Sequence, residues 1–186
     1  YMDEVIKKIP PGSNHLICTP WMLGERCPVS STTTRATLFN ISMVHTREHL
    51  MRAVYEGIGY NLRWILENYS RDYGFSCDNF RIIGGGALDD TWMHIIADIT
   101  GKCFSVVKDP RNAGAVGAAV VALIGLGELP GFSAAKDFVQ VERCYAPDPK
   151  NRRVYDHLFE NYKRVYNSLK DTYIKANGQR FKGEEE

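Results

Sequence analysis

The chain has 186 residues, of which 44% are hydrophobic and 24% charged, which is enough apolar material for one ordinary globular core. This composition excludes a disordered or fibrous protein. The formal net charge is +1 and the Lys and Arg residues are spread along the sequence, so no basic surface for nucleic acid or an anionic membrane is expected. We therefore expect small molecules or proteins as partners.

The five cysteines are scattered and form no Cys-x-x-Cys pair. An odd, dispersed set argues against a disulfide framework and against a structural zinc site, so we interpret them as reduced thiols of a cytoplasmic protein. The longest apolar run, residues 113–127, is too short to cross a bilayer as a helix. The N-terminus lacks the basic and apolar regions of a signal peptide. Tyr1 precedes the first Met, so we expect the sequence to begin within a longer polypeptide.

The first half of the chain predicts two short strands and one long helix. Strands are expected at residues 15–19 and 36–42, separated by a segment rich in Gly, Pro, Ser and Thr. Thr46 is the expected N-cap of an amphipathic helix in which apolar residues recur every three or four positions up to Tyr69. Its charged residues lie off that stripe: Arg47, Glu48, Arg52, Glu56, Arg63 and Glu67. Two internal glycines cost up to about 1 kcal/mol each, so close packing is expected at Gly57 and Gly59.

The second half alternates strands and helices, which predicts a single α/β unit over residues 1–177, followed by a disordered tail at 178–186. The helix after Asn112 is dense in Gly and Ala, and we expect it to be buried. Asp148 and Pro149 supply an N-cap and a first-turn proline for the last helix, whose Lys and Arg residues we interpret as a solvated face. The expected strands are 80–83, 104–107 and 138–145, and the expected helices begin near Asp90, Asn112 and Asp148.

Three consecutive glycines, Gly84 to Gly86, connect an apolar strand to an amphipathic helix. Glycine permits positive φ and, because it lacks Cβ, lets a ligand approach the main chain; a helix start just beyond adds unpaired N–H groups. A plain tight turn is the alternative. Three glycines between a strand and a helix favour a loop that faces a ligand.

Two kinds of nucleotide site compete for this loop. A dinucleotide fold requires Gly-x-Gly-x-x-Gly and an acidic residue after the next strand, and Gly84, Gly86 and Asp109 fit. The third position is Asp89, followed by Asp90, and carboxylates at a helix N-terminus would repel a pyrophosphate. They suit hydroxyl or amino groups, which favours contact with ribose and base while the phosphates lie elsewhere around a metal ion. A nicotinamide dehydrogenase stays open as the alternative, and a non-catalytic nucleotide-binding module is a third hypothesis.

Three blocks of the sequence resemble the FGGY carbohydrate kinases, which include xylulose, gluconate, ribulose, fuculose and glycerol kinases. Residues 23–28 are similar to the Gly-Glu-Arg-x-Pro segment of xylulose and gluconate kinases. Residues 36–56 follow the second signature of the family, with Asn40 where the signature has Gly. Residues 84–119 resemble the Gly-Gly-Gly-Ala, Asp-x-x-Gly and Gly-Ala-Ala run. The resemblance extends over about residues 16–129.

The resemblance implies an α/β domain of the ribonuclease H-like fold found in actin and hexokinase, with ATP and sugar bound between two such domains. This chain would be the C-terminal domain. By position, Gly84, Gly85, Gly86 and Ala87 would line ribose and phosphate. Asp90 stands where glycerol kinases carry an Asn near adenine, and because Asp cannot donate as an amide does, base recognition would differ. The reaction would be transfer of the γ-phosphoryl group of ATP, with Mg2+, to a sugar hydroxyl. D-xylulose is the favoured substrate, and gluconate or the sugar of another FGGY kinase is the alternative.

The resemblance also implies that most of the chemistry lies outside this chain. The N-terminal domain of the family carries a phosphate loop, most sugar contacts and the general base, so no catalytic residue is expected here. Because phosphoryl transfer needs groups on both sides of the γ-phosphate, we expect the isolated chain to be inactive. Its cleft face, left uncovered, would permit a homodimer.

The remaining polar candidates have structural alternatives. Glu25 and Arg26 would either line the cleft or form a surface ion pair, and both interpretations stay open. The histidines lack metal-ligand spacing, so no metal site is expected. Asp98 is interpreted as a structural carboxylate, and Trp64 and Trp92 as core residues.

Overall fold

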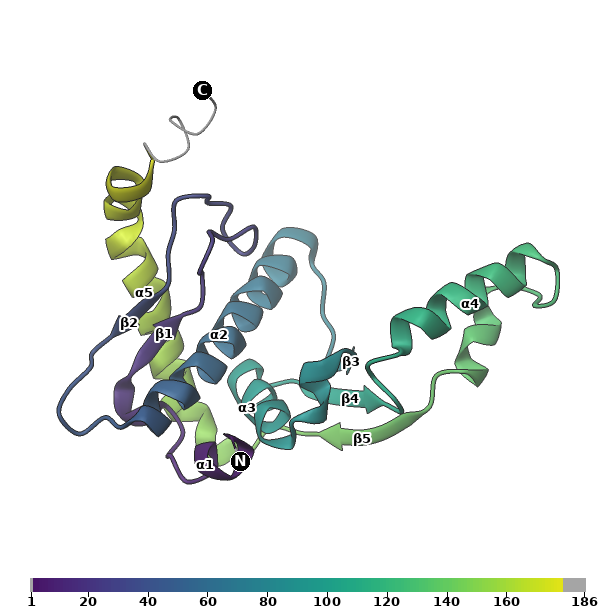
Figure 1. Ribbon diagram of the computed structural model, residues 1–186, viewed down its shortest axis with the longest axis horizontal. Coiled ribbons are helices and arrows are strands. Elements are labelled where there is room, and N and C mark those ends of the chain that lie inside the picture. Colours follow the sequence, from purple (N-terminus) through teal and green to yellow (C-terminus); the bar gives the residue numbers. More distant parts are fainter. Residues whose placement is uncertain (1, 179–186) are drawn as a thin grey trace.

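The structure is a computed structural model that describes residues 2–178, so the predicted tail lies outside the described residues except for Gly178. Two long helices, α2 (Arg47–Tyr73) and α5 (Arg152–Asn177), form the centre of the body. A two-stranded sheet lies beside them, and a three-stranded sheet follows beyond the shorter helix α3 (Asp90–Thr100) (Figure 1). Helices and strands therefore alternate, as the sequence predicts.

The first half begins with α1 (Met2–Ile6), followed by β1 (Ile17–Thr19) and β2 (Thr37–Phe39). The two strands pair antiparallel and are shorter than predicted. Helix α2 follows directly after Thr46, which is its N-cap as predicted. It ends at Gly74, which adopts a left-handed conformation with φ of 63°.

The second half contains the βαβ unit that carries the glycine loop. Strand β3 (Asn79–Ile82) pairs in parallel with β4 (Cys103–Val107), and α3 crosses between them. Strand β5 (Val141–Tyr145) pairs antiparallel with the other edge of β4. Helix α4 (Ala113–Gly125) and a 3-10 helix, η3 (Phe132–Asp137), connect β4 to β5. Short 3-10 turns precede α3 and α5, namely η2 (Gly85–Leu88) and η4 (Pro149–Asn151).

Apolar side chains form two main clusters, one on each side of α3. The first lies among α2, α3 and α5 and contains Trp21, Tyr60 and Tyr162. The second lies between α3 and the three-stranded sheet. The predicted close packing at the α2 glycines is confirmed, because a Cβ on Gly57 would lie 2.2 Å from the carbonyl oxygen of Cys18.

Helix α2 buries charged side chains that the sequence places off its apolar stripe. Arg52, Glu56 and Arg63 are buried, whereas the stripe itself is largely half-buried. Arg52 Nε donates to Glu56 Oε1 over 2.8 Å in the interior. An Arg and a Glu four residues apart look the same in sequence whether the pair faces water or the core, so the pattern did not reveal this burial.

The prediction that the helix after Asn112 is buried is wrong. Within α4 only Val120 is buried, and a Cβ on Gly114 or Gly117 would meet no atom within 4 Å of the described structure. Figure 1 shows why, since α4 projects from the body beyond the ends of the strands. Gly and Ala residues permit another element to pack closely against a helix, but they do not show that such an element is present in this chain. The Asn112 side chain also does not cap α4, because its amide donates to Asp109 Oδ2 over 2.7 Å.

Candidate functional site

The glycine loop begins at the carboxyl end of β3, next to the carboxyl end of the parallel strand β4. Gly84 has φ of 97°, which a side chain would strain, and its N–H donates to the carbonyl of Pro110 over 2.8 Å. The loop then closes as a 3-10 turn in which Ala87 N–H donates to the Gly84 carbonyl over 3.2 Å. Ligands of open α/β sheets bind in the crevice outside the carboxyl ends of the strands, where this loop lies.

The four predicted contact residues of the loop have different surroundings. A Cβ on Gly84 would meet nothing within 4 Å, and one on Gly85 would meet only Arg111 Nε, at 4.0 Å. A Cβ on Gly86 would lie 2.2 Å from the ring of Trp92, and Ala87 is buried in the second cluster. The structure therefore leaves bare backbone open at Gly84 and Gly85, whereas Gly86 and Ala87 are required for packing.

Arg111 is a site residue that the sequence did not single out. It lies on the connection between β4 and α4, which the Gly84–Pro110 hydrogen bond holds against the loop. Arg111 is exposed, and its Nε lies 4.0 Å from the position that a Cβ on Gly85 would take. A cation beside open backbone N–H groups suits a phosphate or another anion. The available signal was a basic residue directly after the Asp109-Pro110 turn.

The two aspartates after the loop are already engaged inside the protein. Asp89 caps α3 by accepting from Trp92 N–H over 2.9 Å, and its other oxygen accepts from the Tyr55 hydroxyl over 3.1 Å. Asp90 Oδ1 accepts from Arg143 Nη1 over 2.5 Å and from the Tyr145 hydroxyl. These oxygens are therefore already engaged within the protein, and contact of the two carboxylates with ribose or base stays a prediction.

The same contacts affect the chemistry of Tyr145. Burial, followed by the hydrogen bond to Asp90, raises the pKa of Tyr145 to about 12. The hydroxyl therefore stays protonated at neutral pH and donates to the carboxylate. Arg143 adds a positive charge beside Asp90, so the start of α3 carries less negative charge than its two aspartates suggest.

A large apolar groove adjoins the loop. It has a volume of about 510 Å³ and lies between α4, η3 and the ends of β3 and β4. Ile83, immediately before Gly84, lines it, together with Val107, Val116 and Phe132. The groove and the glycine loop thus share one edge of the three-stranded sheet.

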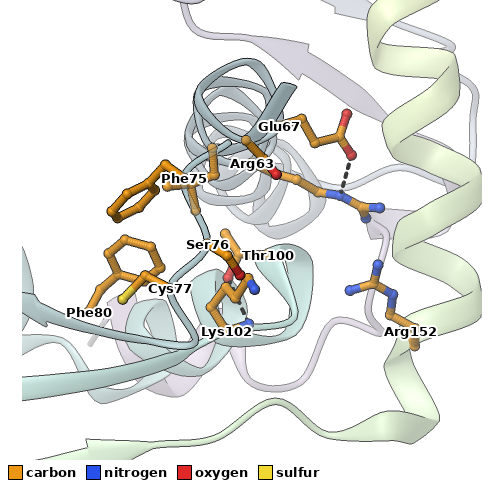
Figure 2. Close-up of a pocket in the computed structure, with 11 residues that line it drawn as sticks. Arg63, Glu67, Phe75, Ser76, Cys77, Phe80, Thr100, Lys102 and Arg152 are labelled. Atoms are coloured by element: carbon orange, nitrogen blue, oxygen red, sulfur yellow. Dashed lines mark hydrogen bonds and ion pairs between the residues drawn. The ribbon is translucent and has the colours of Figure 1, made fainter. Parts of the chain in front are cut away.

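A second cavity, of about 210 Å³, lies at the opposite end of α3 and is drawn in Figure 2. Arg63, Lys102 and Arg152 line it, and each has a carboxylate partner. Arg63 also donates to the carbonyl of Ile99 over 3.2 Å, in the last turn of α3. Cations at a helix C-terminus are favoured by the helix dipole, so this cluster is explained as a structural cap rather than a ligand site.

The other sequence candidates have structural roles. Glu25 accepts from the N–H groups of Arg26, over 2.7 Å, and Cys27, over 3.2 Å, so it braces its loop through the backbone. Asp98 is confirmed as a structural carboxylate, because it accepts from Asp148 N–H over 2.6 Å and from the Asn151 amide over 2.7 Å. All five cysteines are free. Among the described residues, no group of three His, Cys, Asp or Glu side chains could hold a metal ion, and no helix is long and apolar enough to span a membrane.

Residues 5–126 match the family model described as the FGGY family of carbohydrate kinases, C-terminal domain. The chain belongs to this family. A xylulose kinase of Bacillus subtilis (strain 168) is 35% identical over 168 residues, which cover 89% of this chain and 33% of the relative. A gluconokinase of Bacillus licheniformis is 26% identical over 96% of this chain and 35% of the relative. The crystal structure of a ligand-bound xylulose kinase from Lactobacillus acidophilus superposes with a TM-score of 0.85 at 27% identity, covering 95% of this chain and 36% of that chain.

This FGGY chain has the fold that the resemblance implied, an α/β domain of the ribonuclease H-like, actin and hexokinase type. It spans about a third of the length of the curated relatives it matches. Because the chain belongs to a family of carbohydrate kinases, the alternative hypothesis of a nicotinamide dehydrogenase is rejected.

Proposed function

We propose that this FGGY chain is the nucleotide-binding part of an ATP-dependent carbohydrate kinase. The complete enzyme would transfer the γ-phosphoryl group of ATP to a sugar hydroxyl, with D-xylulose giving xylulose 5-phosphate as the favoured reaction and gluconate as the alternative substrate. The xylulose kinase relative, at 35% identity, supports D-xylulose as the favoured substrate. The gluconokinase relative, at 26% identity, supports gluconate as the alternative.

The observation that carries the proposal is the open backbone at Gly84 and Gly85, with Arg111 beside it. The N–H groups of Gly85 and Gly86 begin a 3-10 turn and have no acceptor within that turn. In this proposal they and Arg111 contact the phosphate groups and the ribose. Gly86 and Ala87 hold the loop against Trp92 and the core, and Asp90 acts through its contacts with β5.

The chain supplies binding but no catalytic residue. Neither Gly84 nor Gly85 has a described atom crowding its Cβ position, which leaves room for a nucleotide group against the backbone there. We propose that Mg2+ is held by the nucleotide phosphates and by residues outside this chain. Phosphoryl transfer requires a positioned acceptor hydroxyl and charge stabilisation on both sides of the γ-phosphate, so we expect the isolated chain to show no turnover of xylulose or gluconate with ATP in a coupled assay.

Substitution of Gly85 by Ala tests the nucleotide site directly. The position has ordinary space for a methyl group, so the free energy of unfolding should change by less than about 0.5 kcal/mol, while a methyl in the ligand path should weaken ATP binding about tenfold, or about 1.4 kcal/mol. Gly125→Ala is the matched control, since a Cβ there also meets nothing within 4 Å and the residue ends α4. Calorimetric titration of the complete polypeptide with ATP and with NADH measures the affinity for each nucleotide in the parent and in the two variants. Unchanged ATP affinity in Gly85→Ala, or binding of NADH without ATP, would overturn the proposal.

The sugar specificity needs a separate assay. The complete kinase, supplied with ATP and Mg2+, should turn over D-xylulose with a higher kcat/KM than gluconate in a coupled ADP-release assay. A higher value for gluconate would reverse the order, and no turnover with either sugar would reject both.

The exposed apolar surface of α4 and η3 is the part of the chain that we propose contacts the rest of the kinase. Val121 is 55% exposed and Phe132 is 71% exposed, and both line the apolar groove. In the isolated chain the same surface would favour a homodimer. Light scattering of the chain and of a Val121→Glu, Phe132→Glu variant tests this, since a dimer through this surface should dissociate in the variant.

A further inference from the structure

The side chain of Arg143, on β5, forms hydrogen bonds to both ends of the turn between the glycine loop and α3. Arg143 Nη2 donates to the carbonyl of Ala87 over 3.3 Å, and Nη1 donates to Asp90 Oδ1 over 2.5 Å. Nη1 also donates to the Tyr145 hydroxyl over 3.1 Å, and that hydroxyl donates to Asp90 Oδ1. The guanidinium thus spans the last residues of the loop and the first residue of α3.

The strand geometry explains why these groups converge. Arg143 and Tyr145 are two residues apart on β5, so their side chains project from the same face. They pair with Val106 and Phe104 of β4, and Phe104, Val106, Tyr145 and Ala87 belong to the same apolar cluster. Packing therefore places the two polar heads at the edge of that cluster, where α3 begins.

We propose that Arg143 is a positioning residue for the nucleotide loop. This inference rests on the proposed function in that the loop is taken as the nucleotide site. By fixing the Ala87 carbonyl and the Asp90 carboxylate, Arg143 orients the turn that presents the N–H groups of Gly85 and Gly86. It also offsets the charge of Asp90, which would otherwise oppose an anionic ligand at this helix start.

The planar fork of Arg is needed because the two acceptors are separate. A Lys at this position keeps the charge, but its single ammonium does not reproduce two parallel donors at fixed spacing. Arg143→Lys therefore separates charge from positioning. Arg143→Ala removes both. Arg153→Ala, at an exposed position in the first turn of α5, is the control.

Hydrogen exchange without nucleotide tests the positioning itself. In Arg143→Ala and Arg143→Lys, the hydrogen-bonded amides of Gly84, Ala87 and Asp89 should exchange at least about tenfold faster than in the parent protein, while the amides of α5 keep their rates. Unchanged exchange in the loop, or equal acceleration in the loop and in α5, would overturn the inference. If Arg143→Ala does not fold, Arg143→Lys alone carries this comparison.

Nucleotide binding tests the consequence in the complete kinase. The KM for ATP should rise about tenfold in both variants, with the KM for the sugar unchanged, and Arg153→Ala should match the parent. A rise that Lys fully reverses would overturn positioning in favour of charge alone. If the parent protein binds no ATP, the proposed function fails, whereas the exchange experiment still decides whether Arg143 positions the loop.

Discussion

Replacing Glu56 by Gln should strongly destabilise the fold. The carboxylate is 1% exposed and accepts four hydrogen bonds, from Gly12 N–H (2.8 Å), the Ser13 hydroxyl (2.7 Å), Arg52 Nε (2.8 Å) and the Tyr155 hydroxyl (3.1 Å). Three donors point at Oε1 and only Ser13 points at Oε2. A Gln amide can therefore keep the three bonds at its oxygen and donate to the Ser13 hydroxyl, so what it removes is the charge that compensates Arg52.

The magnitude follows from that lost charge. Removing one partner of a buried ion pair costs about 3–5 kcal/mol, because the other charge stays buried without compensation. Glu56 also holds the turn from Gly12 to His15, where φ values of 85°, 47°, 52° and 66° include three non-glycine residues in the left-handed region. Because Gln keeps the hydrogen bonds to Gly12 and Ser13, we expect this turn to persist in the variant and to add nothing to the loss. We expect Glu56→Gln to lose at least about 3 kcal/mol, a large share of a typical total of about 5–15 kcal/mol.

Urea denaturation of the parent and variant chains measures this loss. Glu67→Gln is the matched control on the same helix: Glu67 is 44% exposed and pairs with Arg63 and Lys163, and exposed pairs are worth about 0–1 kcal/mol. The double variant Glu56→Gln, Arg52→Met should be more stable than the sum of the single losses, because it removes the uncompensated charge. A loss below about 1 kcal/mol for Glu56→Gln would refute the reasoning.

Three further predictions follow from burial. Gly86→Ala should lower the free energy of unfolding by about 1–3 kcal/mol in urea denaturation, because the new Cβ would lie 2.2 Å from the Trp92 ring; an unchanged midpoint would contradict this. Burial raises the pKa of the Cys18 thiol to about 11, so a thiol reagent at pH 8 should label exposed Cys27 rapidly and Cys18 only on unfolding, as peptide mass spectrometry would detect. Because the folded-state pKa of Tyr145, about 12, exceeds its ordinary value of 10, its contribution to stability is complete below pH 10 and is lost as the pH rises towards 12; Tyr145→Phe should weaken that alkaline decline in thermal melts.

The sequence predicted the order and type of the main elements because their signals are local. Helix α3 has a capping Asp89 at one end and a left-handed Gly101 at the other, and it begins at Asp90 as predicted. The structural role of Asp98 was also predicted. Strand ends were predicted less well: β5 begins at Val141, three residues later than expected, since Phe138 is the C-cap of the 3-10 helix η3, and its pairing with β4 shifts register between Val106 and Val107. The register of a strand depends on its partner strand, so it cannot be predicted from the sequence of one strand alone.

At the candidate site, too, features that depend on adjacent residues were predicted, whereas features that depend on residues distant in sequence were not. The three glycines predicted a loop with exposed backbone, but nothing in sequence distinguishes Gly86, which faces the Trp92 ring, from Gly85, which faces open space. Asp89 and Asp90 looked alike as carboxylates beside the loop. Their partners, Tyr55 for one and Arg143 for the other, lie 34 and 53 residues away, so only the fold could show that both are engaged.

The exposed helix α4 connects the fold to the proposed function. Its Gly and Ala residues permit close packing on several sides, yet within residues 2–178 it buries only Val120. An apolar groove of about 510 Å³ under such a helix, beside the glycine loop, is costly to leave in water, since burial of apolar surface contributes about 25 cal/mol per Å². The surface that would contact the rest of the kinase and the loop that would hold the nucleotide therefore share one sheet edge. We propose that contact of the rest of the kinase with α4 would change the surroundings of Gly84 and Gly85 and would thereby couple assembly to nucleotide binding.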